Sequence, residues 1–162
     1  RHYETGESIP ESLYQKMLAA RNYMSASGFM RQLGLGKLDL DLHVKLNDYR
    51  GRDLDEVDRE ILADYKAPLA TDGPSMARRF SHLFSSPTGY AAGYYSYIWS
   101  EVLDADSVEW FKENGGLERR NGDHFRATLL SRGGSKEAMS LFRDFRGRDA
   151  DVTPLLNRRG LN

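Results

Sequence analysis

The sequence predicts a mostly α-helical protein, an irregular helical domain with no β-sheet layer. Apolar residues recur at helical spacing in several stretches, capping residues precede some of these stretches, and no strand–helix–strand alternation is visible. A chain of 162 residues is long enough for one folded unit with a buried core. We therefore expect residues 1–162 to form a single helical segment.

The first half of the chain carries three helical patterns. Pro10 occupies a first helical position, where its missing N–H costs nothing. Apolar side chains then continue at helical spacing, as they do again in the leucine-rich stretch that follows. Asp53 and Glu56 form an N-terminal capping pattern ahead of the third stretch. The predicted helices span residues 10–24, residues 29–46 and, after the Asp53 cap, as far as Tyr65.

The second half opens with a loop over residues 67–79, which prolines and glycines punctuate. A short strand or extended segment is predicted over 80–84, followed by a turn over 85–89. A helix is then predicted over 91–103, and Asp106 with Glu109 predicts the cap of a further helix that closes at Asn114. Ser135 is expected to cap the last helix. The final two predicted helices span 125–130 and 136–146.

Charge and composition exclude several classes of partner. The chain has 23 Lys and Arg against 24 Asp and Glu, a formal charge of −1, so it lacks the basic excess of nucleic-acid-binding proteins. No run of 18 apolar residues occurs, and we expect no membrane partner. The absence of cysteine fits a cytoplasmic protein. The opening Arg1-His2-Tyr3-Glu4 is unusual for a gene product and predicts a part of a longer polypeptide.

The usual catalytic motifs are missing from this sequence. Its four histidines never fall four positions apart, so the two-histidine helical zinc pattern is absent, and there is no cysteine nucleophile or phosphate-binding glycine loop. We therefore expect no metal site within the chain. The histidines are His2, His43, His82 and His124.

A tyrosine-rich motif over residues 89–101 is the strongest candidate site. On one helix, Tyr90, Tyr94, Tyr97 and Glu101 would fall at i, i+4, i+7 and i+11, on a single face. A second set would face the core. It consists of Tyr95, Ile98, Trp99 and Val102.

Aligned phenols suit one kind of chemistry in particular. A phenol stays protonated at neutral pH and donates a hydrogen bond from a rigid body, so a row of them could stabilise a developing oxyanion. Gly89 and Gly93 would let this segment approach a ligand closely or hinge. Tyrosines at helical spacing also occur simply as packing residues, in which case Tyr90 and Tyr97 would be buried with internal partners.

Four stretches together resemble the C-terminal part of the thimet-oligopeptidase family of zinc metallopeptidases, over nearly the whole chain. The resemblance implies a two-lobed, zincin-like, mostly helical enzyme that hydrolyses short peptides at one zinc ion. It also implies that the zinc ligands and the catalytic Glu lie upstream, in a part absent from this chain. The matching stretches are Arg1–Pro10, His82–Glu101, Leu130–Ser135 and Arg159–Asn162.

The resemblance further implies roles for single residues. Tyr97 and Tyr90 would be catalytic, donating hydrogen bonds to the scissile carbonyl. The substrate-binding residues would be His82, Tyr94, Gly89 and Gly93.

The resemblance also implies partners and an activity. The partners would be short peptides and the upstream part of the same polypeptide. The ending Arg159–Asn162 favours the peptidyl-dipeptidase branch, which releases C-terminal dipeptides, with oligopeptidase A-like endopeptidases next. Two alternative functions are a non-catalytic peptide-binding module and a purely structural helical domain. As part of a peptidase, the chain alone is expected to be inactive.

Overall fold

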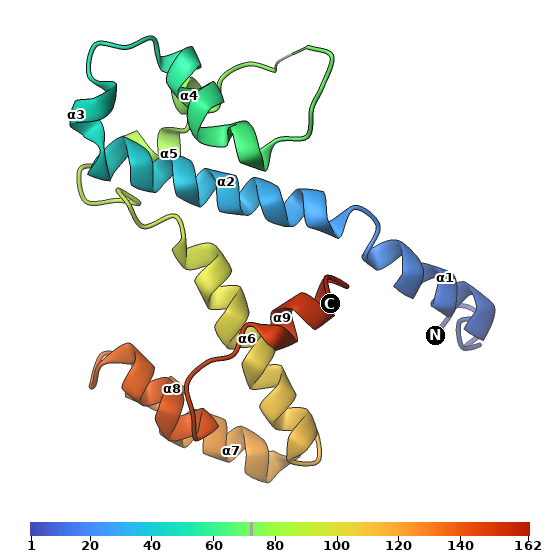
Figure 1. The fold of residues 1–162 in the computed structure, drawn as a ribbon. Helices are drawn as coiled ribbons and strands as arrows, with labels where there is room; N and C mark the ends of the chain where they lie inside the picture. The colour runs from blue at the N-terminus through green and yellow to red at the C-terminus, as the bar shows by residue number, and fades with distance from the viewer. Residues whose placement is uncertain (72) are drawn as a thin grey trace.

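The structure is a computed structural model that describes residues 1–71 and 73–162. Asp72, in the predicted loop 67–79, lies outside the described residues. Within those two ranges every regular element is a helix (Figure 1), which confirms the mostly α class. The α-helices are α1 (Glu11–Arg21), α2 (Ser25–Val44), α3 (Leu46–Tyr49), α4 (Leu54–Leu62), α5 (Ser81–Phe84), α6 (Ser96–Glu113), α7 (Arg119–Thr128), α8 (Ala138–Arg146) and α9 (Thr153–Arg158). Short 3-10 turns are η1 (Ala63–Tyr65), η2 (Ala77–Arg79) and η3 (Leu130–Arg132).

One hydrophobic core joins the end of α2 to α4, η2 and α5. The predicted Asp53 cap is confirmed, because its carboxylate accepts the N–H groups of Asp55 and Glu56 at the start of α4. The apolar face of α4 then packs on α2, and the segment leading into α5 closes the other side. The buried members are Leu35, Leu38, Val57, Ile61, Leu62, Ala77, Phe80 and Leu83.

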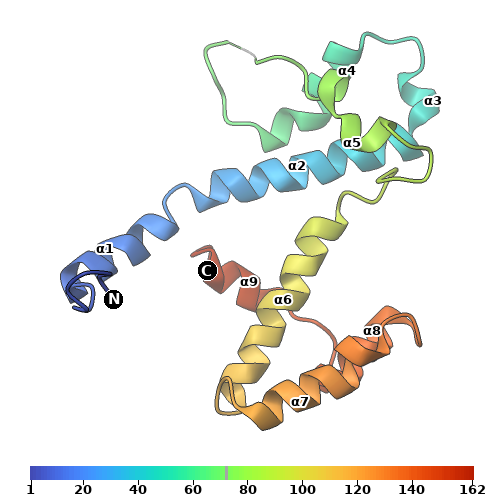
Figure 2. The same ribbon diagram turned by 180° about the vertical axis from the view of Figure 1, so that it is seen from behind.

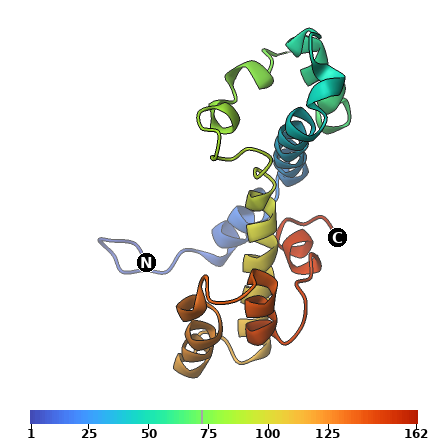
Figure 3. The ribbon, with the colours of Figure 1, turned by 90° about the vertical axis from the view of Figure 1, so that its left-hand side faces the viewer.

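A second core lies along α6, where α9 packs on it. Val102 and Ala105 pack against Leu155 of α9, and α7 and α8 close an aromatic cluster around Phe145. Figure 3 shows α6 running between the α2–α5 region and the α7–α8 region. The tyrosine motif thus lies between the two cores.

Helix α1 stands apart from both cores. It has no buried residue, and Figures 1 and 2 show it projecting beyond the start of α2, away from α4 and α5. No helix within the described ranges is both long enough and apolar enough to cross a membrane.

Several predicted elements differ in the structure. The segment predicted as a strand over 80–84 instead forms the helical turn α5 from Ser81, and Phe80 and Leu83, three residues apart, are both buried in the core. The two helices predicted over 91–103 and after Asp106 are the single helix α6, and Asp106 lies inside it with its carboxylate paired to arginines. The cap of α8 is Glu137, and Ser135 instead bonds within the preceding turn.

The predicted core-facing stripe of the tyrosine motif is also only half right. Val102 is buried and Ile98 packs against the second core, but the side chains of Tyr95 and Trp99 are exposed. Within α6, Ile98 and Val102 lie four residues apart and face the second core, whereas Trp99 lies one position further round the helix. Tyr95 precedes α6.

Candidate functional site

The tyrosine motif lies mostly outside a helix. Tyr90 and Tyr94 belong to the irregular segment between α5 and α6, and only Tyr97 stands in the first turn of α6. The prediction that these tyrosines share one helical face is therefore wrong. Glu101, expected at the end of that face, instead forms an ion pair with Arg159.

The side chains of the motif nevertheless meet in space. The rings of Tyr90 and Tyr97 are stacked, with centroids 5.7 Å apart, and Tyr94 lies 5.0 Å from Tyr97. His82, on α5, packs its ring edge-on to Tyr90 at 5.6 Å. We call His82, Tyr90, Tyr94 and Tyr97 the tyrosine cluster.

The cluster is anchored in the first core. Tyr90 and Tyr94 pack against the buried residues of that core, and the ring of buried Phe80 meets Tyr94 edge-on at 4.9 Å. Tyr97 and His82 remain exposed. The fold thus fixes one side of the cluster and leaves the other open.

The hydroxyls of Tyr90 and Tyr97 are hydrogen-bonded to each other. The pKa of Tyr97 is raised above its ordinary value of 10.0, first by that bond and then by partial loss of solvent and by the neighbouring phenols. Tyr97 is therefore protonated at neutral pH. Tyr97 is 44% exposed, whereas the purely structural interpretation predicts burial.

The two glycines of the motif occupy different surroundings. A Cβ added to Gly93 would lie 2.7 Å from the Tyr90 carbonyl oxygen, too close for any other residue to fit without a shift. At Gly89 the nearest atom would be the Cβ of Ser86 at 3.4 Å. Gly93 is thus required by close backbone approach, and Gly89 much less so.

One residue at this site escaped the sequence analysis. Asp39 of α2 is fully buried, and its carboxylate accepts hydrogen bonds from the backbone N–H groups of Ala92 and Tyr94. The available signal was its position four residues after Leu35, which puts a carboxylate on the buried face of an apolar helix.

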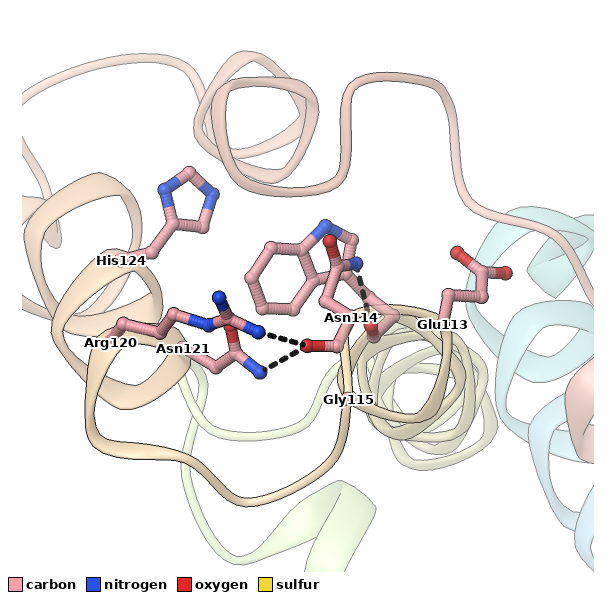
Figure 4. A pocket seen from close by; sticks show the side chains of 7 residues that line it. Glu113, Asn114, Gly115, Arg120, Asn121 and His124 are labelled. Carbon is pink, nitrogen blue, oxygen red and sulfur yellow. Dashed lines mark hydrogen bonds between the residues drawn. The ribbon is translucent and has the colours of Figure 1, made fainter.

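The described residues also enclose hollows away from the cluster. One of about 500 Å³ lies at the corner of α6 and α7 (Figure 4). The polar groups there are used by the fold: Asn121 and Arg120 donate to the carbonyl of Asn114, and the amide of Asn114 donates to Trp110. Two others, of about 350 and 300 Å³, border the start of α2. None of the three is lined by the tyrosine cluster.

Among the residues that the structure describes, no group of three or more His, Cys, Asp or Glu side chains is placed to hold a metal ion. The residues present therefore do not fit a zinc site of their own. What they offer at the cluster is hydrogen-bond donation from phenols and an imidazole.

Residues 1–161 match the family model described as Peptidase family M3. The chain belongs to this peptidase family. The match runs through the tyrosine cluster, α2 and α6, so the site described above lies within the part shared with other members of peptidase family M3.

The chain is similar to several curated members of this family. Identity is 44% to oligopeptidase A and 36% to dipeptidyl carboxypeptidase, both from Escherichia coli K12, with 99% and 100% of this chain aligned. Organellar oligopeptidase A of Arabidopsis thaliana is 41% identical over 99% of the chain. The chain spans only 23%, 24% and 21% of the lengths of these three relatives.

Proposed function

We propose that this chain is the C-terminal part of a zinc metallopeptidase that hydrolyses short peptides. Its contribution is the tyrosine cluster, which binds substrate and stabilises the oxyanion formed during cleavage. The zinc and its ligands would come from outside these residues, in the upstream part of the same polypeptide, and the steps below concern this chain alone. The supporting observation is that an exposed phenol, Tyr97, is hydrogen-bonded to Tyr90 within a chain of peptidase family M3.

The paired hydroxyls suggest how the donors are used. Two phenols hold two protons, and the bond between Tyr90 and Tyr97 uses one, so one O–H remains free for a peptide carbonyl. When that carbonyl oxygen becomes negatively charged, it is the stronger acceptor and can draw both O–H groups toward itself. The two donors would then act mainly in the transition state.

The remaining cluster members have positions suited to substrate binding. Exposed His82 can bond a peptide backbone, and Tyr94, tilted against Tyr90, forms a wall that packs on the first core. Gly93 brings this wall close to the backbone at Tyr90. Gly89 lies in the preceding turn, where it would allow the segment to move.

Tyr97→Phe tests this role in the full-length enzyme. The change removes one oxyanion donor while keeping the ring, so kcat should fall by about 10²–10³-fold. KM should change little, because the bond is strongest in the transition state. Steady-state kinetics on a fluorogenic peptide measures both constants.

Tyr95→Phe is the matched control, because Tyr95 belongs to the same motif but its exposed side chain lies outside the cluster. It should leave both constants near the wild-type values. A Tyr97→Phe enzyme with a changed KM and an unchanged kcat would contradict the transition-state role.

The preferred mode of cleavage within this proposal is internal. The identity to oligopeptidase A exceeds that to dipeptidyl carboxypeptidase, which reverses the order given by the C-terminal residues of the sequence. An endopeptidase should cleave a short peptide whether its C-terminus is free or amidated. Mass spectrometry of the products decides, since C-terminal dipeptides released only from the free acid would indicate a peptidyl-dipeptidase.

The proposal includes a cytoplasmic location for the intact protein. Cellular location differs among the relatives, because one is named as cytosolic and another as chloroplastic and mitochondrial. Cell fractionation with an antibody against this segment tests it.

A further inference from the structure

We infer that Asp39 is the positioning residue of the peptidase site: its buried carboxylate holds the backbone that presents Tyr90, Tyr94 and Tyr97. The expected effect on kcat rests on the proposed function. The expected effect on the backbone between α5 and α6 rests on geometry alone. Asp39 touches none of the reacting groups and acts through the segment between α5 and α6.

Both oxygens of this carboxylate are used. Oδ1 accepts the N–H of Ala92 at 2.9 Å, and Oδ2 accepts the N–H of Tyr94 at 2.7 Å. Hydrogen bonds to a carboxylate are among the stronger ones in proteins. Because Asp39 belongs to α2 and is 0% exposed, these two bonds tie an irregular segment to a regular helix 53 and 55 positions earlier.

The segment needs such a tie, because its backbone departs from ordinary conformations. Ala92 has a φ of +61°, a left-handed value that is strained for a residue other than glycine. Gly93 follows directly, with its N–H bonded to the Tyr90 carbonyl. The bonds from Ala92 and Tyr94 flank this tight turn and compensate for its strain.

The same turn of α2 also contacts α5. His43, one turn after Asp39, bonds the backbone carbonyl of Asp39 through Nδ1 at 2.8 Å, with Oδ1 of the carboxylate 3.0 Å away, and its ring stacks on Phe84 at the end of α5. Asp39 and His43 therefore connect α2 to the segment on its Tyr94 side and on its α5 side. A rigid helix thus sets the position of the phenols.

Asp39→Asn tests the inference in the full-length enzyme. The amide has nearly the same shape but only one acceptor oxygen, so its NH₂ group would oppose one of the two backbone N–H groups. We expect kcat to fall on the order of 10- to 100-fold, as misplacement by about 1 Å can cause. We also expect faster hydrogen exchange at the amides of Ala92 and Tyr94.

Asp58→Asn is the matched control. Asp58 is another buried carboxylate of the same core, 1% exposed, and it accepts the N–H of Ala77 and pairs with Lys66. Its replacement should raise exchange at Ala77 and leave the amides of Ala92 and Tyr94 protected. It should also leave kcat near the wild-type value.

A second measurement separates positioning from general destabilisation. In a Tyr97→Phe background, Asp39→Asn should lower kcat by a smaller factor than in the wild type, because the part of its effect that acts through the Tyr97 hydroxyl is already lost. Asp58→Asn should show no such coupling. Equal losses of kcat from the two Asn variants, with unchanged exchange at Ala92 and Tyr94, would overturn the inference.

The inference and the proposed function can fail separately. If Tyr97→Phe alone leaves kcat unchanged, the oxyanion role is wrong, and hydrogen exchange still decides whether Asp39 holds the segment. If Asp39→Asn does not yield folded enzyme, exchange in the wild type decides. Amides of Ala92 and Tyr94 that exchange as fast as an unstructured peptide would overturn the inference, and slow exchange supports it.

Discussion

At the scale of single residues, the site depends on how closely backbone and side chain approach. Gly89 and Gly93 look equivalent in the sequence, since each precedes a tyrosine. In the structure, only Gly93 faces a carbonyl oxygen at a distance that a Cβ cannot tolerate. The backbone conformation beside the phenols therefore requires a residue without a Cβ at position 93.

Gly93→Ala should disturb the cluster far more than Gly89→Ala. The new Cβ would push the Tyr90 carbonyl away and shift its ring relative to Tyr97. We expect kcat/KM of the full-length enzyme to fall by about tenfold or more for Gly93→Ala. Similar losses for both variants would instead indicate that freedom of the segment, and not close packing, is what the glycines provide.

At the scale of elements, buried carboxylates join helices that are distant in sequence. Asp106, fully buried in α6, accepts hydrogen bonds from Arg146 of α8 and from Arg148, and also from the N–H of Asp151 ahead of α9. Arg146 in turn pairs with Glu113 near the end of α6. This network holds α8 and α9 to one face of α6.

Asp106→Asn should destabilise this junction by about 1.5–3 kcal/mol, because it weakens the buried acceptor of Arg146 and Arg148 and leaves Arg146 with Glu113 as its remaining carboxylate partner. Burial raises the pKa of Asp106, but the hydrogen bonds from Arg148 and Arg146 outweigh it, and the net pKa lies below the ordinary 3.8. The stabilisation is thus present above about pH 4 and is lost as pH falls through that lower pKa.

Thermal unfolding of wild type and variant across pH provides the measurement. The difference in melting temperature should be constant near neutrality and should shrink only below about pH 4. A difference that shrinks already between pH 6 and 8 would assign the effect to another group.

At the scale of the whole molecule, the chain exposes much surface for its size. Its accessible area is 11,295 Å², whereas a compact protein of 18.4 kDa exposes about 8,200 Å². The excess follows from two separate cores and from α1, which buries no residue. The buried residues thus gather in two regions that α6 connects.

The purified chain by itself should cleave no fluorogenic peptide and bind no stoichiometric zinc. The reason is chemical: its cluster offers hydrogen-bond donors, and the described residues form no group able to hold a metal. Peptide cleavage assays and metal analysis of the dialysed protein test this. Robust cleavage that a chelator abolishes would contradict the proposed division of labour, and tight peptide binding without cleavage would favour the binding-module alternative.

The helical class, the Asp53 cap and the family follow from the amino-acid sequence, because periodicity, capping residues and unbroken motifs are local signals. It also singled out the tyrosines, although for the wrong geometric reason. Their meeting is not produced by helical spacing, since Tyr90 and Tyr94 precede α6.

Which groups surround those tyrosines depends on how distant helices pack. The bonds of Asp39 to Ala92 and Tyr94, and of Asp106 to Arg146, join positions at least 40 residues apart. Whether a buried carboxylate finds a donor depends on how helices pack, and no pattern within a short window contains that information. For the same reason Asp106 reads as a cap in the sequence and is an interhelical ion-pair centre in the fold.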